Sequence, residues 1–274
     1  MNKCVLRFAA KGFSALVATL VLALPGVALG AEVKIMVEPS YPPDKAAEVF
    51  KPLADYLAKA TGHKITLLTP RNYHFFWRDV RQNTPIDLVF EEAHFTDYHV
   101  KHYNFVPIAK TAEKTSYTLL GSDQLKAPTL DALVGRRIVT MPSPSLGFAL
   151  LIEFFPNVMA QPDIQSSAAS WRDGVETVFA GEADAAIVPT WLKEQYPNLS
   201  AIKTSRAFPG SAFSASATLD PKIRQDITVA LLKLHENKEY YAILSELGTA
   251  KFVEANAAEY DGAQKMLKGF FGFQ

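Results

Sequence analysis

The residues best suited to chemistry in this chain form the segment Pro-Ser-Pro-Ser-Leu-Gly at positions 142–147. The segment follows a β-branched run and precedes an apolar stretch with helical spacing, so we expect it to begin a helix. The unpaired N–H groups and the positive end of the dipole at such a terminus favour a bound anion. Ser143 and Ser145 add hydroxyl donors, and Gly147 allows the backbone to come close. The segment therefore suits a tetrahedral oxyanion, although one serine can equally serve only as the helix cap.

A second group with chemical potential is the set His94, His99 and His102, with Glu91 just before it. Zinc sites use histidine and carboxylate ligands. If this stretch is helical, His94 and His102 lie about two turns apart and His99 is turned away from their face. One ion cannot easily reach all three, so metal binding is kept as an alternative function and the predicted site contains no metal or other cofactor.

Sequence signatures of catalysis are missing from the chain. It contains no Gly-x-Ser-x-Gly elbow, no phosphate-binding Gly-rich loop that ends in Gly-Lys-Ser/Thr, and no His-Glu-x-x-His. The one cysteine, Cys4, lies close to the N-terminus, before an apolar run. We therefore predict no catalytic residues and expect the protein not to be an enzyme.

The N-terminus has the layout of a secretory signal peptide. Lys3, Arg7 and Lys11 precede an uncharged apolar run over residues 13–29, and small residues make cleavage before Ala31 plausible. An uncleaved anchor is the alternative. Removing residues 1–30 takes three basic residues from a total of 28 and leaves all 28 acidic ones, a net charge of −3. This balance offers no basic stripe for nucleic acid, and we expect a protein exported to the periplasm.

The elements that position these residues are short β-branched runs that alternate with helical patterns. Such alternation predicts a parallel-sheet α/β protein. An apolar stripe from Ala46 to Leu57 predicts the first helix, and Asp220 with Pro221 predicts the start of a C-terminal helix. The predicted strands cover residues 33–37, 65–68, 86–90, 117–120, 137–141 and 185–188.

Several segments, taken in order, resemble the periplasmic binding proteins of phosphate, phosphite and phosphonate importers. They are FKPLADYLAKATG at 50–62, IDLVF at 86–90, LDALVGRRIV at 130–139, AGEADAAI at 180–187 and FVEANAAEYD at 252–261. Together they cover most of the chain after the signal peptide.

The resemblance implies the two-lobed type II periplasmic binding protein fold, with hinge strands and a central ligand cleft. We expect residues 1–30 to be the signal peptide, 31–119 the first part of lobe 1, 120–205 lobe 2, and 206–274 the return to lobe 1. The chain is expected to cross between lobes near residues 118–122 and 204–210. Open α/β sheets bind ligands beyond the carboxyl ends of their strands, which agrees with a cleft site.

The resemblance also extends to the cleft residues. Tyr73 matches a pocket tyrosine of the family, and the segment from Ser143 to Gly147 matches its oxyanion loop, although Leu146 and Pro144 replace the usual hydroxyl residues. Tyr41 joins the predicted site because it follows a strand.

Two further positions depart from the family pattern. Glu91 and Glu92 stand where an aromatic residue and a glycine are common, and Trp171 and Arg172 stand where relatives often carry a histidine and a carboxylate. Glu91 is included in the predicted site, where it can face Arg172 or a cationic part of the ligand. Arg172 can grip an anion through two hydrogen bonds.

The sequence thus predicts a monomeric solute-binding protein that captures a small oxyanion, such as phosphate, phosphite or a phosphonate. Its expected partner is the permease of an ABC importer. The alternative is a sensing module for a membrane receptor.

Overall fold

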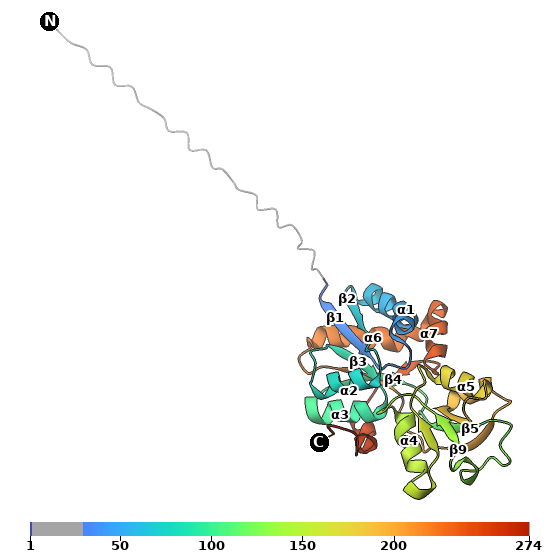
Figure 1. The fold of residues 1–274 in the computed structure, drawn as a ribbon. Coiled ribbons are helices and arrows are strands. Elements are labelled where there is room, and N and C mark those ends of the chain that lie inside the picture. Colours follow the sequence, from blue (N-terminus) through green and yellow to red (C-terminus); the bar gives the residue numbers. More distant parts are fainter. Residues whose placement is uncertain (2–29, 274) are drawn as a thin grey trace.

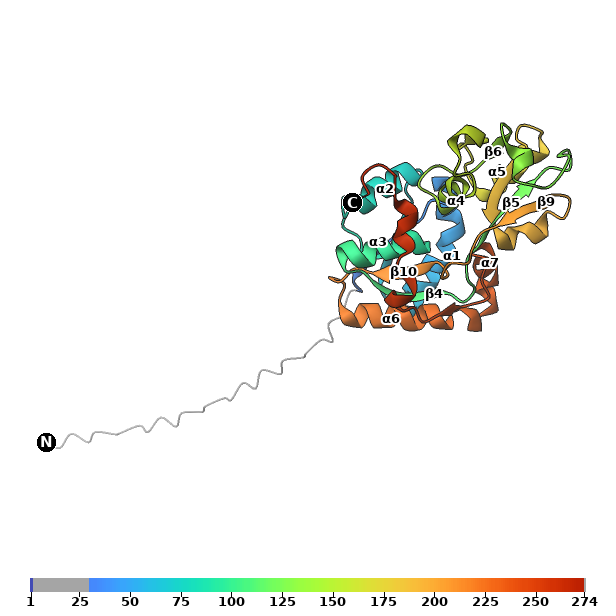
Figure 2. The same cartoon turned by 90° about the horizontal axis from the view of Figure 1, so that it is seen from below.

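The structure, a computed structural model, describes Met1 and residues 30–273, and it contains two α/β lobes side by side (Figures 1 and 2). The predicted signal peptide falls almost entirely outside the described residues. Within residues 30–273 no helix is both long and apolar enough to cross a membrane.

The first lobe is built on a six-stranded sheet with helices on both faces (Figure 1). Its strand order is β11-β4-β10-β3-β1-β2. The strands are β1 (Glu32–Val37), β2 (Lys64–Leu68), β3 (Leu88–Glu91), β4 (Val106–Thr111), β10 (Ala212–Ala215) and β11 (Phe252–Val253). The helices are α1 (Pro43–Thr61), α2 (Tyr73–Arg81), α3 (Ala93–Tyr103), α6 (Pro221–Lys233) and α7 (Tyr241–Glu246).

The second lobe has a five-stranded sheet with the order β7-β6-β8-β5-β9. Its strands are β5 (Tyr117–Gly121), β6 (Arg137–Val139), β7 (Asp163–Gln165), β8 (Ala185–Pro189) and β9 (Ser200–Thr204), and its helices are α4 (Leu146–Phe154) and α5 (Trp171–Phe179). Short 3₁₀ turns complete the two lobes: Asp131–Leu133, Val158–Ala160, Thr190–Gln195, Leu234–Glu236, Lys238–Tyr240, Ala257–Tyr260 and Ala263–Leu267.

The chain passes between the lobes over residues 112–116 and 205–211. The two passages are paired, because Thr115 and Phe208 exchange backbone hydrogen bonds of 3.0 and 2.7 Å. The second passage lies where the sequence predicts it. The first is displaced: residues 118–121 belong to β5 in the second sheet, so the predicted lobe boundary after residue 119 falls inside a strand. A continuous β-branched run cannot show on which side of a hinge it lies.

Both sheets are mixed, whereas the alternation of strands and helices predicted parallel ones. β1 runs parallel to β2 and β3, but β10 is antiparallel to β3 and β4. In the second lobe β5 is antiparallel to β8 and β9. The strands β5 and β10, each antiparallel to both of its neighbours, are those that follow the two passages, since each enters its sheet from the other lobe.

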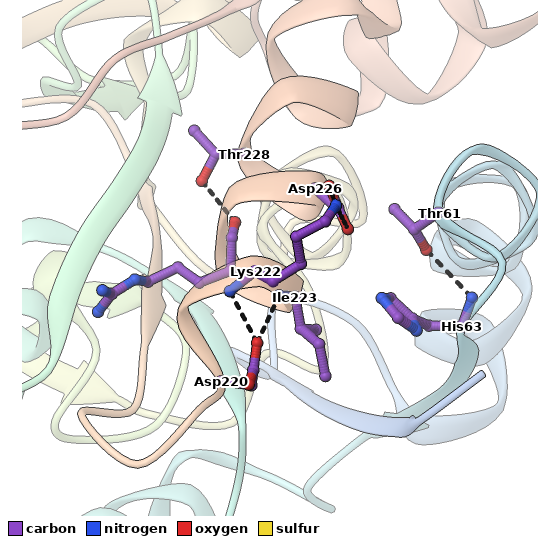
Figure 3. Close-up of polar contacts among 8 residues, drawn as sticks. Thr61, His63, Asp220, Lys222, Ile223, Asp226 and Thr228 are labelled. Atoms are coloured by element: carbon purple, nitrogen blue, oxygen red, sulfur yellow. Dashed lines mark hydrogen bonds and ion pairs between the residues drawn. The ribbon is translucent and has the colours of Figure 1, made fainter. Parts of the chain in front are cut away.

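Helix ends agree with the local chemistry of the sequence. The Asp220 carboxylate accepts hydrogen bonds from the backbone N–H groups of Lys222 and Ile223, at 2.7 and 3.2 Å, and so caps α6 (Figure 3). Gly62 ends α1 in the left-handed conformation with φ of 73°. α1 and α6 pack together over the same face of the first sheet.

One apolar cluster joins the lobes. It begins beneath α2 and α3, with Phe76 and Phe95, and continues to Leu119 and Leu150 of the second lobe. The C-terminal turn at Ala263–Leu267 lies against α3 (Figure 1). The lobes are therefore in close contact, and what lies between them is a closed cleft.

Candidate functional site

A cavity of about 180 Å³ lies between the lobes. Its walls come from the carboxyl ends of β1 and β3, from α5 and the turn after β8, from the first passage, and from the end of α7. Parallel strands end at the same edge of a sheet, so the residues after β1 and β3 meet there. This is the position in which a two-lobed protein encloses a ligand.

Two acids at this edge, Glu38 and Glu92, are buried and linked to each other. Glu38 follows β1 and Glu92 precedes α3, and their side chains are 4% and 9% exposed. The backbone N–H of Glu92 donates to Glu38 Oε2 at 2.6 Å, and the hydroxyl of Tyr117, from the second lobe, donates to Glu92 Oε1. Glu38 Oε1 and Glu92 Oε2 have no hydrogen-bond partner. Buried oxygens in this state are costly unless a ligand or water satisfies them.

Burial also governs the protonation of this pair. It raises the pKa of Glu92 to about 7 and, together with the neighbouring charge of Glu92, raises the pKa of Glu38 well above its usual value. At neutral pH the pair therefore keeps a proton.

Glu91, a predicted site residue, lines the cavity but has a partner inside the first lobe. His99 Nδ1 lies 2.7 Å from Glu91 Oε1, and both side chains are buried. Burial raises the pKa of Glu91, while His99 opposes the shift. This acid is therefore held by the protein itself, and it does not face Arg172.

Tyr41 and Arg172, two more predicted residues, meet at Glu246. The Tyr41 hydroxyl donates to Glu246 Oε2 at 2.8 Å, and Arg172 Nη2 lies 3.4 Å from the same oxygen. Arg172 Nη1 also donates to Gln195 at 3.0 Å. Because Glu246 ends α7 and Arg172 lies on α5, this ion pair connects the lobes at the rim of the cavity.

Aromatic side chains form much of the remaining wall. Trp171 and Trp191 come from the second lobe, and Tyr117 contacts Trp171 edge-on with 5.1 Å between ring centroids. Trp191 lies so close to Gly248 that a Cβ there would be 2.6 Å from its indole nitrogen. Gly248 also has φ of 65°, so this contact between lobes depends on glycine.

The predicted oxyanion loop does not line the cavity. Ser145 is fully buried as the N-cap of α4: its Oγ accepts from the N–H of Phe148 at 3.3 Å and donates to the carbonyl of Met141 at 3.2 Å. Gly147 lies behind Trp171, where a Cβ would come within 2.9 Å of the indole ring. Leu146 is core, and Ser143 is half-buried outside the cavity. The capping interpretation of the serine describes Ser145 correctly.

Tyr73 is also away from the cavity lining. It is fully buried at the start of α2, where it stacks near Phe95, and burial raises the pKa of its hydroxyl. It lies behind Glu38 and contributes to the environment of that acid.

The histidines of the alternative metal site point to separate partners. His94 Nε2 donates to the carbonyl of Pro144 in the other lobe at 3.1 Å, His99 pairs with Glu91, and His102 Nε2 lies 3.1 Å from Gln264 Oε1. Burial lowers the pKa of His94 to about 3, so this ring is neutral. Among residues 30–273 no group of three or more His, Cys, Asp or Glu side chains is placed to hold a metal ion.

Sequence reasoning missed Glu38, Trp191 and Glu246. Glu38 had a usable signal, because it directly follows β1 just as Tyr41 does a few residues later. Trp191 and Glu246 had no usable signal in the sequence, since they reach the cavity only because one lobe docks on the other.

Comparison with known proteins places this geometry in a family. The family model described as ABC transporter, phosphonate, periplasmic substrate-binding protein matches residues 35–260. No curated protein matches the chain by sequence.

Solved structures share the fold at low identity. PhnD1 from Prochlorococcus marinus, in complex with methylphosphonate, has a TM-score of 0.74 at 15% identity over 86% of this chain and 96% of its own. A binding protein component of an ABC phosphonate transporter from Pseudomonas aeruginosa has a TM-score of 0.71 at 14% identity, over 87% and 86%. A Xanthomonas citri protein bound to ATP has a TM-score of 0.65 at 13% identity, over 86% and 95%. Because the family model matches the chain from β1 to the 3₁₀ turn at Ala257–Tyr260, the chain belongs to the phosphonate-type periplasmic substrate-binding proteins of ABC transporters.

Proposed function

We propose that this protein captures a small phosphate-, phosphite- or phosphonate-like solute between its lobes in the periplasm and presents it to the permease of an ABC importer. The observation that carries the proposal is the inter-lobe cavity, whose walls come from both sheets and from the hinge. The family consists of substrate-binding proteins. Accordingly, we propose binding without catalysis, by a monomer.

Oxyanion donors are available at the hinge side of this cavity rather than at the N-terminus of α4. Lys114, Thr115, Ser116 and Thr190 line it there, and Ser116 and Thr190 already share a hydrogen bond of 2.9 Å. A lysine with several hydroxyls can hold an oxyanion through charge-assisted hydrogen bonds.

Thermal unfolding with methylphosphonate, phosphite and phosphate tests the proposal. A ligand at 100 times its Kd stabilises the native state by about 2.7 kcal/mol, which for a chain of this size raises the Tm by roughly 5 to 11 °C. In small-angle scattering the same ligand should lower the radius of gyration, because binding increases the fraction of molecules with closed lobes. The absence of any Tm shift across these oxyanions would overturn the oxyanion assignment.

A further inference from the structure

Two neighbouring acids of the first lobe, Glu38 and Glu92, are covered by the second lobe. The hydroxyl of Tyr117, on β5, donates a hydrogen bond to Glu92 across the boundary between the lobes. Glu38 Oε1 and Glu92 Oε2 are buried and accept no hydrogen bond from the rest of the described chain. Because these two oxygens are out of reach of solvent, a solute in the cavity does not contact them. The acid pair therefore has to be satisfied by the protein itself.

The contact between the two side chains requires a proton. Glu92 and Glu38 are close enough for a hydrogen bond between their carboxyl groups. Ionised carboxylates only accept hydrogen bonds, so this bond exists only when one of the two acids is protonated. The nearby donors are already used, since the backbone N–H of Glu92 donates to Glu38 Oε2 and Tyr117 donates to Glu92 Oε1. The closed geometry thus suits a pair that holds one proton.

The elements of the first lobe that pack around the acid pair supply no free positive charge. Glu91, on β3, is paired with His99 of α3. Tyr73, on α2, lies beside Glu38, and burial raises the pKa of its hydroxyl. Burial likewise raises the pKa of Tyr117 from the other lobe. Both tyrosines are therefore neutral and can only donate or accept hydrogen bonds.

The charged groups on the cavity side have other positions or partners. His94, two residues after Glu92, is neutral and bonds to Pro144. Arg172, on α5, is paired with Glu246. Lys114, on the first passage, lines the cavity but forms no ion pair or hydrogen bond with either acid in the described part of the chain. No basic side chain among residues 30–273 thus holds the acid pair in its ionised form.

We propose that the acid pair is a proton-dependent latch between the lobes: closure takes up one proton, which Glu38 and Glu92 share, and opening releases that proton to water. When the lobes separate, Tyr117 moves away with the second lobe and water can hydrate both carboxylates. The charged form is therefore disfavoured only in the closed protein. The inference goes beyond the proposed function, because the latch acts on closure whatever solute the cavity holds.

The direction of the pH dependence follows from the closed geometry. Burial raises the pKa of Glu92 to about 7 in the closed protein, whereas a hydrated glutamate titrates near 4.5. Protonation therefore favours the closed form fully below pH 4.5, and this advantage is lost as the pH rises through 7. Between pH 6 and pH 8 the equilibrium constant for closure should fall about tenfold.

Calorimetric titration with methylphosphonate at pH 6 and pH 8 tests the latch in the parent and in the double variant Glu38→Gln/Glu92→Gln. Because the ionisation of methylphosphonate itself is the same in both titrations, the ratio of the two affinities reports the protein alone. Relative to the double variant, the parent should lose about tenfold in affinity between pH 6 and pH 8. Glu48→Gln, at a 72% exposed side chain on α1, is the matched control and should follow the parent.

Tyr117→Phe is a second variant that separates the latch from a merely structural contact. The Tyr117 hydroxyl favours the ionised form of Glu92, so its removal should raise the pKa of Glu92 and move the loss of affinity to higher pH. A structural contact alone would lower the affinity equally at both pH values. Small-angle scattering of the ligand-free proteins adds a measurement that needs no solute. The radius of gyration of the parent should be larger at pH 8 than at pH 6, and that of the double variant should not change.

The outcomes separate the latch from the proposed function. If methylphosphonate binds and the affinity ratio is the same at both pH values, or if Tyr117→Phe leaves the pH profile in place, the latch is wrong and the oxyanion function stands. If methylphosphonate does not bind, the oxyanion assignment fails and the scattering decides about the latch. A radius that responds to pH equally in the parent and the double variant, or in neither, then overturns it.

Discussion

Removing the ionisable group at position 92 should change how stability depends on pH. The folded pKa of Glu92, about 7, lies above the ordinary glutamate value of 4.5, so the folded state holds the proton more tightly. The tighter proton binding by Glu92 stabilises the folded state fully below pH 4.5, and this stabilisation is lost as the pH rises through 7. Each pH unit in this window corresponds to about 1.4 kcal/mol, so the total is on the order of 3 kcal/mol. Glu92→Gln, which keeps the side chain's shape, should lack this loss.

Urea unfolding of parent and Glu92→Gln at pH 4.5, 6 and 8 measures the effect as a difference between two proteins. A difference is needed because His94 also makes stability depend on pH. Its pKa of about 3 in the folded protein means that the free energy of unfolding rises as the pH rises to 6.5, which partly hides the Glu92 contribution in the parent. The variant should gain on the parent by about 3 kcal/mol between pH 4.5 and 8, equivalent to roughly 6 to 12 °C in Tm. The control variant Glu48→Gln, at an exposed side chain on α1, should show no such gain. Parallel pH curves for parent and Glu92→Gln would refute a buried, proton-holding carboxyl.

Two further predictions separate structural from binding roles. Ser145→Ala should lower the free energy of unfolding by about 1 kcal/mol through loss of the α4 cap and leave methylphosphonate affinity unchanged, because Ser145 does not reach the cavity. A tenfold loss of methylphosphonate affinity without loss of stability would show that the loop from Ser143 to Gly147 belongs to the binding site. Gly248→Ala should weaken ligand binding and keep the lobes apart in small-angle scattering, because its Cβ would overlap Trp191 in the closed form. If Gly248→Ala with saturating ligand had the same radius of gyration as the liganded parent, the contact between Gly248 and Trp191 would not control closure.

Much of the fold could be predicted because it depends on local signals. β1, β2, β5 and β8 are runs of β-branched or apolar residues, and their existence needs no knowledge of neighbours. β10 could not be predicted in this way. Its four residues, Ala-Phe-Ser-Ala, have modest strand preference and become a strand because β3 and β4 flank them on both sides.

The site was harder to predict because it is shared by two lobes. Tyr41 and Arg172 were assigned to the site from the sequence, but neither could be paired with Glu246, which lies 74 residues beyond Arg172 on α7. The loop from Ser143 to Gly147 has the composition of an anion site, yet the position of Trp171 decides what that loop can reach. Side-chain types limit the possible chemistry, and only the docking of the lobes selects among the possibilities.

The acid pair also bears on what drives closure. In an open form water can hydrate Glu38 and Glu92, whereas in the closed form Tyr117 of the second lobe covers Glu92 and two oxygens stay without partners. Contacts such as His94 with Pro144 and Arg172 with Glu246 favour closure, but the second pair is partly exposed and contributes at most about 1 kcal/mol. A ligand shifts the equilibrium only by its difference in affinity for the two forms. A solute in the inter-lobe cavity supplies that difference when it contacts the walls from both lobes, because in an open form it can contact only one of them.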